Sequence, residues 1–281
     1  MKKLYTPQQL QGHFRGQHGS DLSRIMAEDI YTRLQDTKRP FPTVLDAGAG
    51  TGTLRGVIYP QYGQERYLSV DLSPTALTKC SGETLVADIE DDLPLENATF
   101  DAVVSNMVLH WVNNVPATLI RLGRLLKPDG IFMASTLGTE SFPELRASFA
   151  AAGSAVPHII PLTDVRSAGM ALQKVGFAMP VVDRETITLT YPTLAALWQE
   201  LRDSGSHNFH PERQKGLTGK NQWRAMENHY RKEFSTPDGR IQVTLEVLYL
   251  HGWRPHSSQQ KPLAPGSATV ELSEVLKTLP L

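Results

Sequence analysis

The chain has 281 residues, of which 40% are hydrophobic and 20% are charged, and its formal net charge is −1. This balance is typical of a globular protein and argues against a nucleic-acid partner. A single cysteine, Cys80, excludes an internal disulfide and a cysteine-based zinc site. The N-terminus lacks an apolar stretch behind its two lysines, and no apolar run approaches the roughly 20 residues that cross a bilayer. We therefore expect a cytoplasmic protein with no membrane partner and no metal.

The first half of the chain alternates short apolar strands with helical segments. The pattern predicts strands over 42–48, 66–71, 83–88, 100–106 and 130–136, and helices over 22–36, 53–60, 73–80 and 115–128. Pro60 is expected to stop the second helix. Ser73 and Pro74 are placed to cap and open the third. Strands separated by helices indicate βαβ units, so we expect a doubly wound, mostly parallel α/β sheet over residues 40 to 136.

The second half predicts helices over 141–153 and 164–177, then two alternating strands, 181–191 and 243–253, that suit an antiparallel edge hairpin. A helical insert lies between these strands, where a substrate lid is expected. The chain then divides into an N-terminal closing segment (1–38), a cofactor-binding core (39–192), a helical lid insert (193–240), a last strand (241–254) and a polar tail (255–281).

One short stretch carries the main chemical signal. It reads "VLDAGAGTG" and places Gly48, Gly50 and Gly52 at and just beyond the end of the predicted strand 42–48, close behind Asp46. A glycine run between a strand and a helix lets the backbone turn sharply and approach a ligand closely. A plain tight turn is the simpler interpretation. The spacing also departs from the dinucleotide pattern G-x-G-x-x-G, whose third position is Thr53 here.

Two further acids lie at the ends of predicted strands. Asp71 ends the next strand, 23 residues after Gly48, where an acid accepts ribose hydroxyls. Asp88 and Ile89 end the third. Together with D-x-G-x-G-x-G this order resembles the class I S-adenosylmethionine-dependent methyltransferases, whose fold is a seven-stranded Rossmann-like sheet. The resemblance implies S-adenosylmethionine as cofactor. It implies a cofactor site that comprises Asp46, Gly48, Gly50, Gly52, Asp71, Leu72, Asp88, Ile89 and Asn106. Asp46 is expected to order the loop or meet the cofactor's ammonium.

Later blocks narrow the resemblance. The stretches "SNMVLHW", "STLGTESFPELR", "GLTG" and "TLEVLYLHGW" resemble the BioC family, the malonyl-acyl-carrier-protein O-methyltransferases of biotin synthesis. The resemblance covers about residues 10–254 and implies a malonyl-loaded acyl-carrier protein as partner. One departure is that "HFRGQHGSDL" has Phe14 and His18 but lacks the aromatic that usually follows in the family. The tail is instead similar to the mitochondrial complex I assembly factors with a methyltransferase fold, which are associated with hydroxylation of a protein arginine.

Methylation of a malonyl carboxylate needs alignment and exclusion of water more than an acid or base, because the carboxylate is already ionised at neutral pH. Arginine suits the carboxylate geometrically. By its match to the "ELR" block, Arg146 is the first candidate for this clamp, with Arg213 and Lys220 as further candidates. A solvated helix residue is the simpler interpretation of Arg146.

Other features admit structural explanations. Residues 202 to 234 carry an excess of basic residues that suits docking of an acidic carrier, although a solvated helical face gives the same count. His110 and Trp111 are expected to pack rather than catalyse.

"HPE", with His210 and Glu212, has half of a two-histidine, one-carboxylate iron pattern that His229 or His251 would complete, and coincidence is the preferred interpretation. A nucleic-acid base methyltransferase is disfavoured because "SNMV" lacks the prolines of N-P-P-Y. A protein that binds the cofactor without transferring methyl stays open, as does the oligomeric state.

Overall fold

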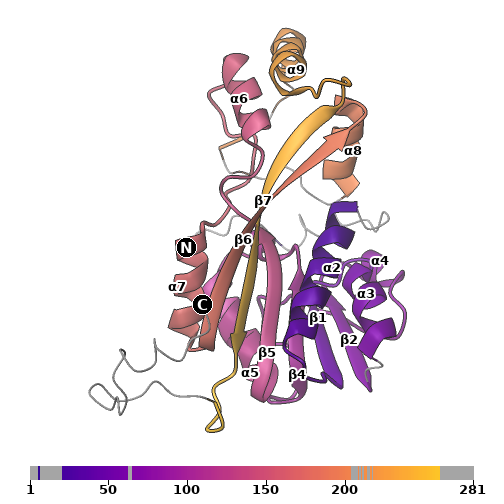
Figure 1. Cartoon of the computed structure of the whole chain (residues 1–281), viewed down its shortest axis with the longest axis vertical. Coiled ribbons are helices and arrows are strands. Elements are labelled where there is room, and N and C mark those ends of the chain that lie inside the picture. The colour runs from indigo at the N-terminus through magenta and orange to yellow at the C-terminus, as the bar shows by residue number, and fades with distance from the viewer. Residues whose placement is uncertain are drawn as a thin grey trace, which may run out of the picture.

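The computed structural model describes residues 6, 21–62, 65–203, 208, 210, 212, 213, 216 and 218–259. These residues build one seven-stranded sheet in the order β3-β2-β1-β4-β5-β7-β6, flanked by helices (Figure 1). The strands are β1 Thr43–Ala47, β2 Arg66–Asp71, β3 Glu83–Val86, β4 Phe100–Asn106, β5 Leu126–Leu137, β6 Ala178–Tyr191 and β7 Ile241–Trp253. The helices are α2 Asp21–Asp36, α3 Thr53–Tyr62, α4 Pro74–Leu77, α5 Val115–Leu125, α6 Pro143–Ala151, α7 Val165–Val175, α8 Leu194–Asp203 and α9 Lys220–Phe234, with a 3₁₀ turn, Leu109–Trp111.

The first five strands run parallel, and β7 pairs antiparallel with both β5 and β6. The expected doubly wound α/β sheet with an antiparallel edge is therefore confirmed. Parallel strands place their carboxyl ends at one edge, so Ala47, Asp71 and Asn106 come to the same edge of the sheet from three different strands. In open α/β sheets, ligands bind at this edge.

Two apolar clusters cover the two faces of the sheet. Alternate residues of a strand point to opposite faces, so Val44 belongs to one cluster and Leu45 to the other. The first cluster includes residues of α2 and α3, such as Met26 and Ile58, and the second includes residues of α5 and α7. Burial on both faces explains why the strands read as continuous apolar runs in the sequence.

Several predicted boundaries shift by a few residues. The side chain of Ser73 accepts a hydrogen bond from the Ala76 backbone N–H and Pro74 opens α4, as expected, but this helix ends at Leu77. Helix α3 continues two residues past Pro60. Leu126 and Lys127 belong to β5, because a residue before a proline, here Pro128, disfavours helical backbone.

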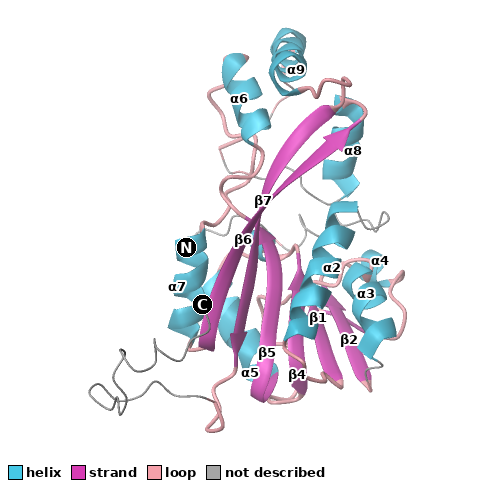
Figure 2. Ribbon diagram, in the orientation of Figure 1, coloured by secondary structure: helices cyan, strands magenta, loops and turns pink. Residues whose placement is uncertain are grey.

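The antiparallel strands extend past the rest of the sheet as a two-stranded arm. β5 pairs with β7 only as far as Leu137 opposite Val247, whereas β6 and β7 continue to pair up to Tyr191 opposite Ile241. The insert between them contains α8 and α9, which lie beside the arm together with α6, on the side toward which the parallel strands point (Figure 2). The closing role of this insert stays a prediction.

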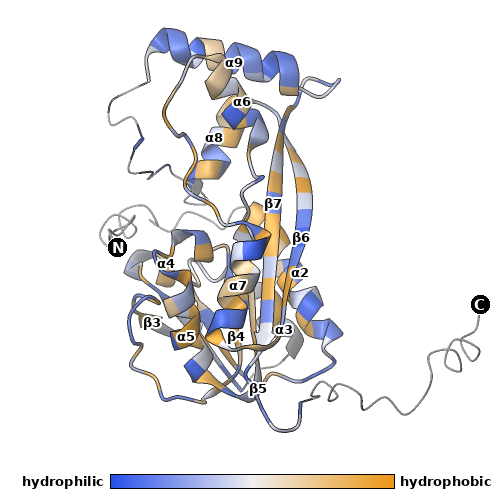
Figure 3. Cartoon of the chain, turned by 90° about the vertical axis from the view of Figure 1, so that its left-hand side faces the viewer, coloured by the Kyte–Doolittle hydropathy of each residue, from blue (hydrophilic) through white to orange (hydrophobic). Residues whose placement is uncertain are grey.

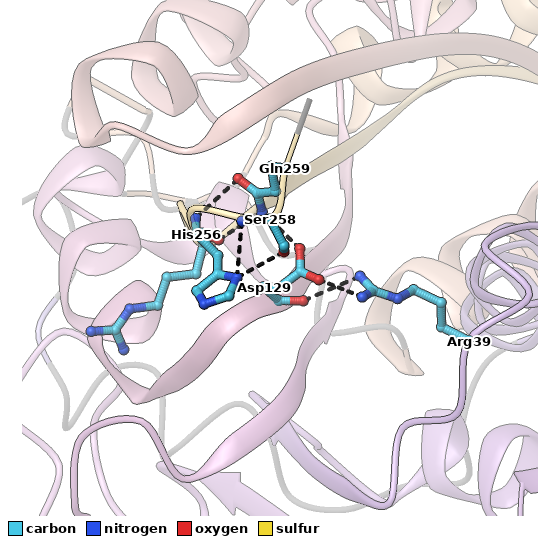
Figure 4. Close-up of polar contacts among 6 residues, drawn as sticks. Arg39, Asp129, His256, Ser258 and Gln259 are labelled. Atoms are coloured by element: carbon cyan, nitrogen blue, oxygen red, sulfur yellow. Dashed lines mark hydrogen bonds and ion pairs between the residues drawn. The ribbon is translucent and has the colours of Figure 1, made fainter. Parts of the chain in front are cut away.

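The chain leaves β7 at the opposite edge of the sheet. There the Asp129 carboxylate accepts hydrogen bonds from Arg39 and from Nε2 of Gln259, the latter at 2.9 Å (Figure 4). The guanidinium of Arg39 also lies 5.0 Å from the ring centre of Trp253. These contacts hold the start of the predicted polar tail, residues 255–259, away from the edge that carries Asp71. Phe14, His18 and the remainder of the tail lie outside the described residues.

Candidate active site

The glycine loop is fixed to the neighbouring strand by its own backbone. The N–H groups of Gly48 and Ala49 both donate to the carbonyl oxygen of Val70, at 2.8 and 2.9 Å, and Gly52 donates back to Ala49 at 2.9 Å. The loop therefore turns over the end of β2 before it enters α3.

The three glycines meet different surroundings, although each has a positive φ. A Cβ on Gly48 would lie 2.5 Å from the side chain of Val108, and one on Gly52 would lie 3.0 Å from Sγ of Cys80. A Cβ on Gly50 would meet nothing within 4 Å. Packing therefore requires glycine at the first position, and Gly50 is the one that borders open space where a ligand can approach the backbone.

Asp71 joins this loop to the strand end. Its Oδ2 accepts a hydrogen bond from the Gly50 N–H at 2.8 Å, and its Oδ1 accepts one from the Ser73 N–H at 2.7 Å. Burial raises the pKa of Asp71, and the hydrogen bonds from Ser73 and Gly50 oppose that rise. The two carboxylate oxygens offer four acceptor positions to the backbone N–H groups of Ser73, Gly50 and Leu72, so the carboxylate retains capacity for the ribose hydroxyl contact that sequence analysis predicts there.

Asp46 lies fully buried at the end of β1. Its Oδ2 accepts a hydrogen bond from the Tyr67 hydroxyl at 3.0 Å, whereas its Oδ1 has no partner in the described part of the chain. Burial raises the pKa of Asp46 to about 7, against the opposing hydrogen bond of Tyr67. An unsatisfied buried carboxylate oxygen at the end of β1, two residues before the glycine loop, fits a ligand that brings a cation or a donor, such as the ammonium group of S-adenosylmethionine.

The remaining predicted cofactor residues occupy the same edge. β3 ends at Val86, so Asp88 and Ile89 lie just beyond it rather than on it. Oδ1 of Asp88 accepts a hydrogen bond from the Glu90 N–H at 2.9 Å, and the side chain of Ile89 is buried. Leu72 follows Asp71 directly and is half-buried. Their contacts with a cofactor stay predictions.

Asn106 forms a link between three elements. Its Nδ2 donates to the backbone oxygen of Ser23 on α2 at 2.8 Å, and its Oδ1 accepts from Oγ of Ser135 on β5 at 2.7 Å. This network positions the N-terminal helix against the cofactor edge. Sequence analysis missed Ser23 and Ser135, because isolated serines carry no pattern.

His110 is a packing residue in this structure. It is buried, its Nδ1 lies 3.2 Å from Oγ1 of Thr136, and burial lowers its pKa to about 3. It is therefore neutral at physiological pH. This agrees with the structural role expected for it. The described residues also contain no group of three histidine, cysteine or acidic side chains arranged to hold a metal.

The three predicted clamp residues lie on the arm side of the molecule. Arg146 is exposed on α6 and donates a hydrogen bond to the backbone oxygen of Ser141. Arg213 is half-buried, with Nη1 at 3.4 Å from the backbone oxygen of His210, and Lys220 is exposed at the start of α9. In the described part of the chain these three side chains make no hydrogen bond or ion pair with one another, and their roles in acceptor binding stay predictions.

A pocket of about 240 Å³ lies between α6, α8, α9 and the end of β5. Its described lining is mainly apolar, with aromatic side chains Phe142, Phe149, Trp198 and Trp223 and five leucines and isoleucines. The polar lining residues are His158, Arg202 and Asn208. The ring of His158 stacks on Phe149 with centres 3.5 Å apart, and burial lowers the pKa of His158. Arg202 was not predicted as a site residue, and no described aspartate or glutamate lines this pocket.

Helix α9 presents its polar side to solvent. Its buried residues are Met226 and Tyr230, whereas Lys220, Arg224 and Arg231 are exposed. Figure 3 shows α9 as hydrophilic along most of its length. Residues three, four or seven apart share one face of a helix, so Lys220, Arg224 and Arg231 form a basic stripe on its outer side, with one acid, the half-buried Glu227, between the two arginines.

Comparison with known proteins agrees with this geometry. The family described as a methyltransferase domain matches residues 45–134. Malonyl-[acyl-carrier protein] O-methyltransferase of Laribacter hongkongensis is 34% identical over 266 residues, which cover 89% of this chain and 88% of the relative. The human mitochondrial arginine-hydroxylase NDUFAF5 is 35% identical over 269 residues, which cover 91% of this chain and 76% of the relative. Among solved structures, the YcgJ protein of Bacillus subtilis superposes with a TM-score of 0.56 at 15% identity, covering 82% of this chain and 99% of that one.

The strand order, the glycine loop and the acid at the end of β2 define a Rossmann-like methyltransferase fold. The chain belongs to the class I S-adenosylmethionine-dependent methyltransferases, within the group that contains the malonyl-carrier methyltransferases and their arginine-hydroxylase relatives. The predictions of an enzyme of this class and of S-adenosylmethionine as its cofactor are confirmed. In the described ranges, no helix is both long and apolar enough to span a membrane.

Proposed function

We propose that this protein methylates the free carboxylate of malonyl-loaded acyl-carrier protein, the reaction that opens biotin synthesis. S-adenosylmethionine supplies a methyl group on a positively charged sulfur, the carboxylate oxygen takes that methyl to form an ester, and S-adenosylhomocysteine leaves. The proposal rests on the relatives with this name, at 33–34% identity over most of the chain, and on the character of the pocket beside the cofactor edge.

The single observation that carries the choice is the polarity of the pocket lining. It contains Arg202 and no described aspartate or glutamate. An arginine side chain as acceptor would bury a guanidinium, and a buried charge needs a paired carboxylate. A carboxylate acceptor instead finds a partner in Arg202, because the guanidinium fork matches carboxylate geometry. The lining therefore favours an acid over an arginine as the acceptor.

The basic stripe of α9 supports the macromolecular partner. Acyl-carrier proteins are acidic, and complementary charge speeds encounter and fixes orientation. Lys220, Arg224 and Arg231 lie exposed on one side of a helix that packs against α6, which helps to line the pocket. A carrier docked on this stripe would lie beside that pocket. We include cytoplasmic localisation in the proposal, since this substrate is a cytoplasmic metabolite carrier.

The test is a mass-spectrometric assay with S-adenosylmethionine and malonyl-loaded carrier, with acetyl-loaded carrier as the control that lacks a carboxylate. We expect a gain of one methyl on the malonyl form alone. Replacement of Arg202 by alanine is expected to lower kcat/KM by about 10- to 100-fold, as for loss of a hydrogen bond to a charged group. Arg146→Ala tests the clamp predicted from sequence, and Arg166→Ala, exposed on α7, is the matched control.

Absence of methylation while S-adenosylmethionine still binds would contradict the proposal. That result would favour the activity for which the second group of relatives is named, hydroxylation of an arginine. An unchanged rate in Arg202→Ala with a lower rate in Arg146→Ala would retain the reaction and assign the clamp to Arg146.

A further inference from the structure

The pocket under α6, α8 and α9 is larger than a malonyl group requires. Its volume is about 240 Å³, whereas an apolar cavity of roughly 150 Å³ binds benzene, with its six carbons. By that scale the pocket accommodates about ten non-hydrogen atoms. A malonyl group offers one methylene between two polar carbonyl carbons, so it would leave most of the apolar lining without a partner.

The lining also prescribes the chemistry of an occupant. Nine of its twelve residues are aliphatic or aromatic, and the rings of Trp198 and Trp223 lie 5.3 Å apart on one side of it. Such a surface gains free energy from methylene groups and loses it from a carboxylate buried without a partner. The apolar body of a ligand therefore belongs among the aromatic side chains, and its charged end belongs beside Arg202.

Trp198 adds a second requirement. Its indole Nε1–H is buried and has no hydrogen-bond acceptor in the described part of the chain. A buried donor without an acceptor costs about 1–3 kcal/mol, so an oxygen on a bound ligand would relieve that cost. Asn208 already donates to the backbone oxygen of Pro157 at 2.7 Å, and His158 pairs with Ser154 at 2.6 Å. Nη2 of Arg202 donates to Oε1 of Gln199 at 3.1 Å. A guanidinium has five N–H donors, so Arg202 retains donors for a ligand, and together with Trp198 it suits an acceptor oxygen or an anion.

We propose that this pocket binds the methylene chain of ω-carboxyacyl thioesters longer than malonyl, with the carboxylate or a carbonyl oxygen at Arg202 and Trp198. This inference rests on the proposed function and extends its substrate class from one acid to a series. Glutaryl, adipyl and pimelyl groups place three to five methylenes between their carbonyl carbons, which matches the apolar lining better than the single methylene of malonyl.

The test is calorimetric titration of the full-length protein with pantetheine thioesters of the dicarboxylic acids from three to seven carbons. We expect Kd to fall about fourfold for each added methylene until the pocket is filled, because burial of one CH₂ contributes about 0.8 kcal/mol. Ile160→Trp, which fills the pocket from the loop before α7, is expected to abolish the length dependence. Ile120→Trp, on the exposed side of α5, is the matched control and should retain it.

A second variant guards against a folding defect. Trp198→Phe keeps the ring and removes the N–H, so we expect affinity to fall by about fivefold at every chain length. Trp253→Phe lies at the opposite edge of the sheet beside Arg39 and should leave all affinities unchanged. Circular dichroism checks that each variant is folded.

The binding series tests the pocket assignment and the methylation assay tests the reaction, so either proposal can be contradicted without the other. Length-dependent binding together with methylation supports both proposals. Methylation of the malonyl carrier with flat or decreasing affinity for longer thioesters overturns the pocket assignment and retains the reaction. Length-dependent binding without methylation supports the pocket assignment and overturns carboxyl methylation. No binding at any length overturns the pocket assignment.

Discussion

Glu144 on α6 and Thr244 on β7 are 100 residues apart in the chain and are joined by two hydrogen bonds. The backbone N–H of Thr244 donates to Oε2 of Glu144 at 3.1 Å, and the Thr244 hydroxyl donates to Oε1. Glu144 is 2% exposed, so its carboxylate is bound by the protein and is not hydrated by solvent. The pair fixes the first turn of α6, and with it Phe142 and Leu145 of the pocket, against the arm.

A second buried acid repeats this arrangement beside the first. Glu246 accepts the Glu140 N–H on Oε2 at 2.8 Å, and its backbone oxygen accepts the Gly138 N–H at 2.8 Å. A Cβ on Gly138 would lie 2.3 Å from the Glu246 carboxylate, which explains the glycine at that position. The blocks "STLGTESFPELR" and "TLEV" are thus joined by the hydrogen bonds of Glu144 and Glu246, which we call the interlock between the end of β5 and the arm. The structure gives these blocks a shared structural role in addition to the family resemblance.

The interlock predicts a large loss of stability on its disruption. Glu144→Ala leaves both Thr244 donors without their acceptor, so we expect the free energy of unfolding to fall by about 1–3 kcal/mol. Urea denaturation measures this, and a double-mutant cycle with Thr244→Val isolates the coupling of the pair. Glu140→Ala is the control, because the side chain of Glu140 is exposed and only its backbone takes part. Equal stability of Glu144→Ala and Glu140→Ala would refute the role assigned to Glu144.

The glycine loop predicts two different defects from the same substitution. Gly50→Ala places its Cβ in open space, so the fold should tolerate the left-handed strain, about 1–2 kcal/mol, while S-adenosylmethionine affinity falls at least tenfold. Gly48→Ala instead drives a Cβ into Val108 and should destabilise the fold itself. Thermal unfolding and cofactor titration of both variants separate these effects. Partial rescue of Gly48→Ala by Val108→Ala is expected, and its absence would contradict the packing explanation.

Asp46 predicts a pH dependence of the cofactor-free protein. Its pKa is about 7 in the folded state against the ordinary 3.8, so the folded state binds a proton that the unfolded state releases. Unfolding then becomes easier as pH rises, and between pH 5 and pH 8 this residue should lower the free energy of unfolding by about 2–3 kcal/mol. The titratable and charged groups that interact with Asp46 are Tyr67, Asp71, Arg55 and Cys80.

Asp46→Asn removes this proton and should flatten the decline of stability between pH 5 and pH 8. Urea denaturation at both pH values, with Asp92→Asn on the surface as control, measures the difference between the slopes. Parallel pH profiles of the parent and Asp46→Asn would show that Asp46 does not bind the proton.

The Asp129 cluster predicts a small effect that does not reach the active site. The side chains of Arg39 and Asp129 are 45% and 20% exposed, and ion pairs of this kind contribute about 0.2–1 kcal/mol. Asp129→Asn removes the charge without adding backbone strain, because asparagine, like aspartate, tolerates the φ of 65° at this position. We expect a loss of stability within that range, smaller at high salt, with unchanged S-adenosylmethionine affinity. A tenfold change in affinity would show coupling between the two edges of the sheet.

Local signals were strong enough to predict most of the fold. β2 and β4 match their predicted bounds, because buried parallel strands are continuous apolar runs between turn residues. The predicted end of α5 at residue 128 lies three residues beyond the observed end at Leu125. The apolar run continues through Leu126, so the sequence does not mark the boundary between this helix and β5. Asp71 and the glycines were predicted as cofactor residues because a ligand edge of this kind repeats its residue types at the ends of successive strands, and their contact with the cofactor stays a prediction.

The sequence by itself determined the class of enzyme, its cofactor and the parallel sheet, since these depend on short segments whose residues lie close together in the chain. Only the tertiary structure decided which side chains share the pocket and which acids hold the arm. Arg202, Trp198, Phe149 and Trp223 come from three helices with more than 20 residues between some of them, and Glu144 reaches Thr244 across 100 residues. Contacts between residues so far apart in the sequence depend on how the arm packs on α6. The spacing of residue types along the chain does not reveal them.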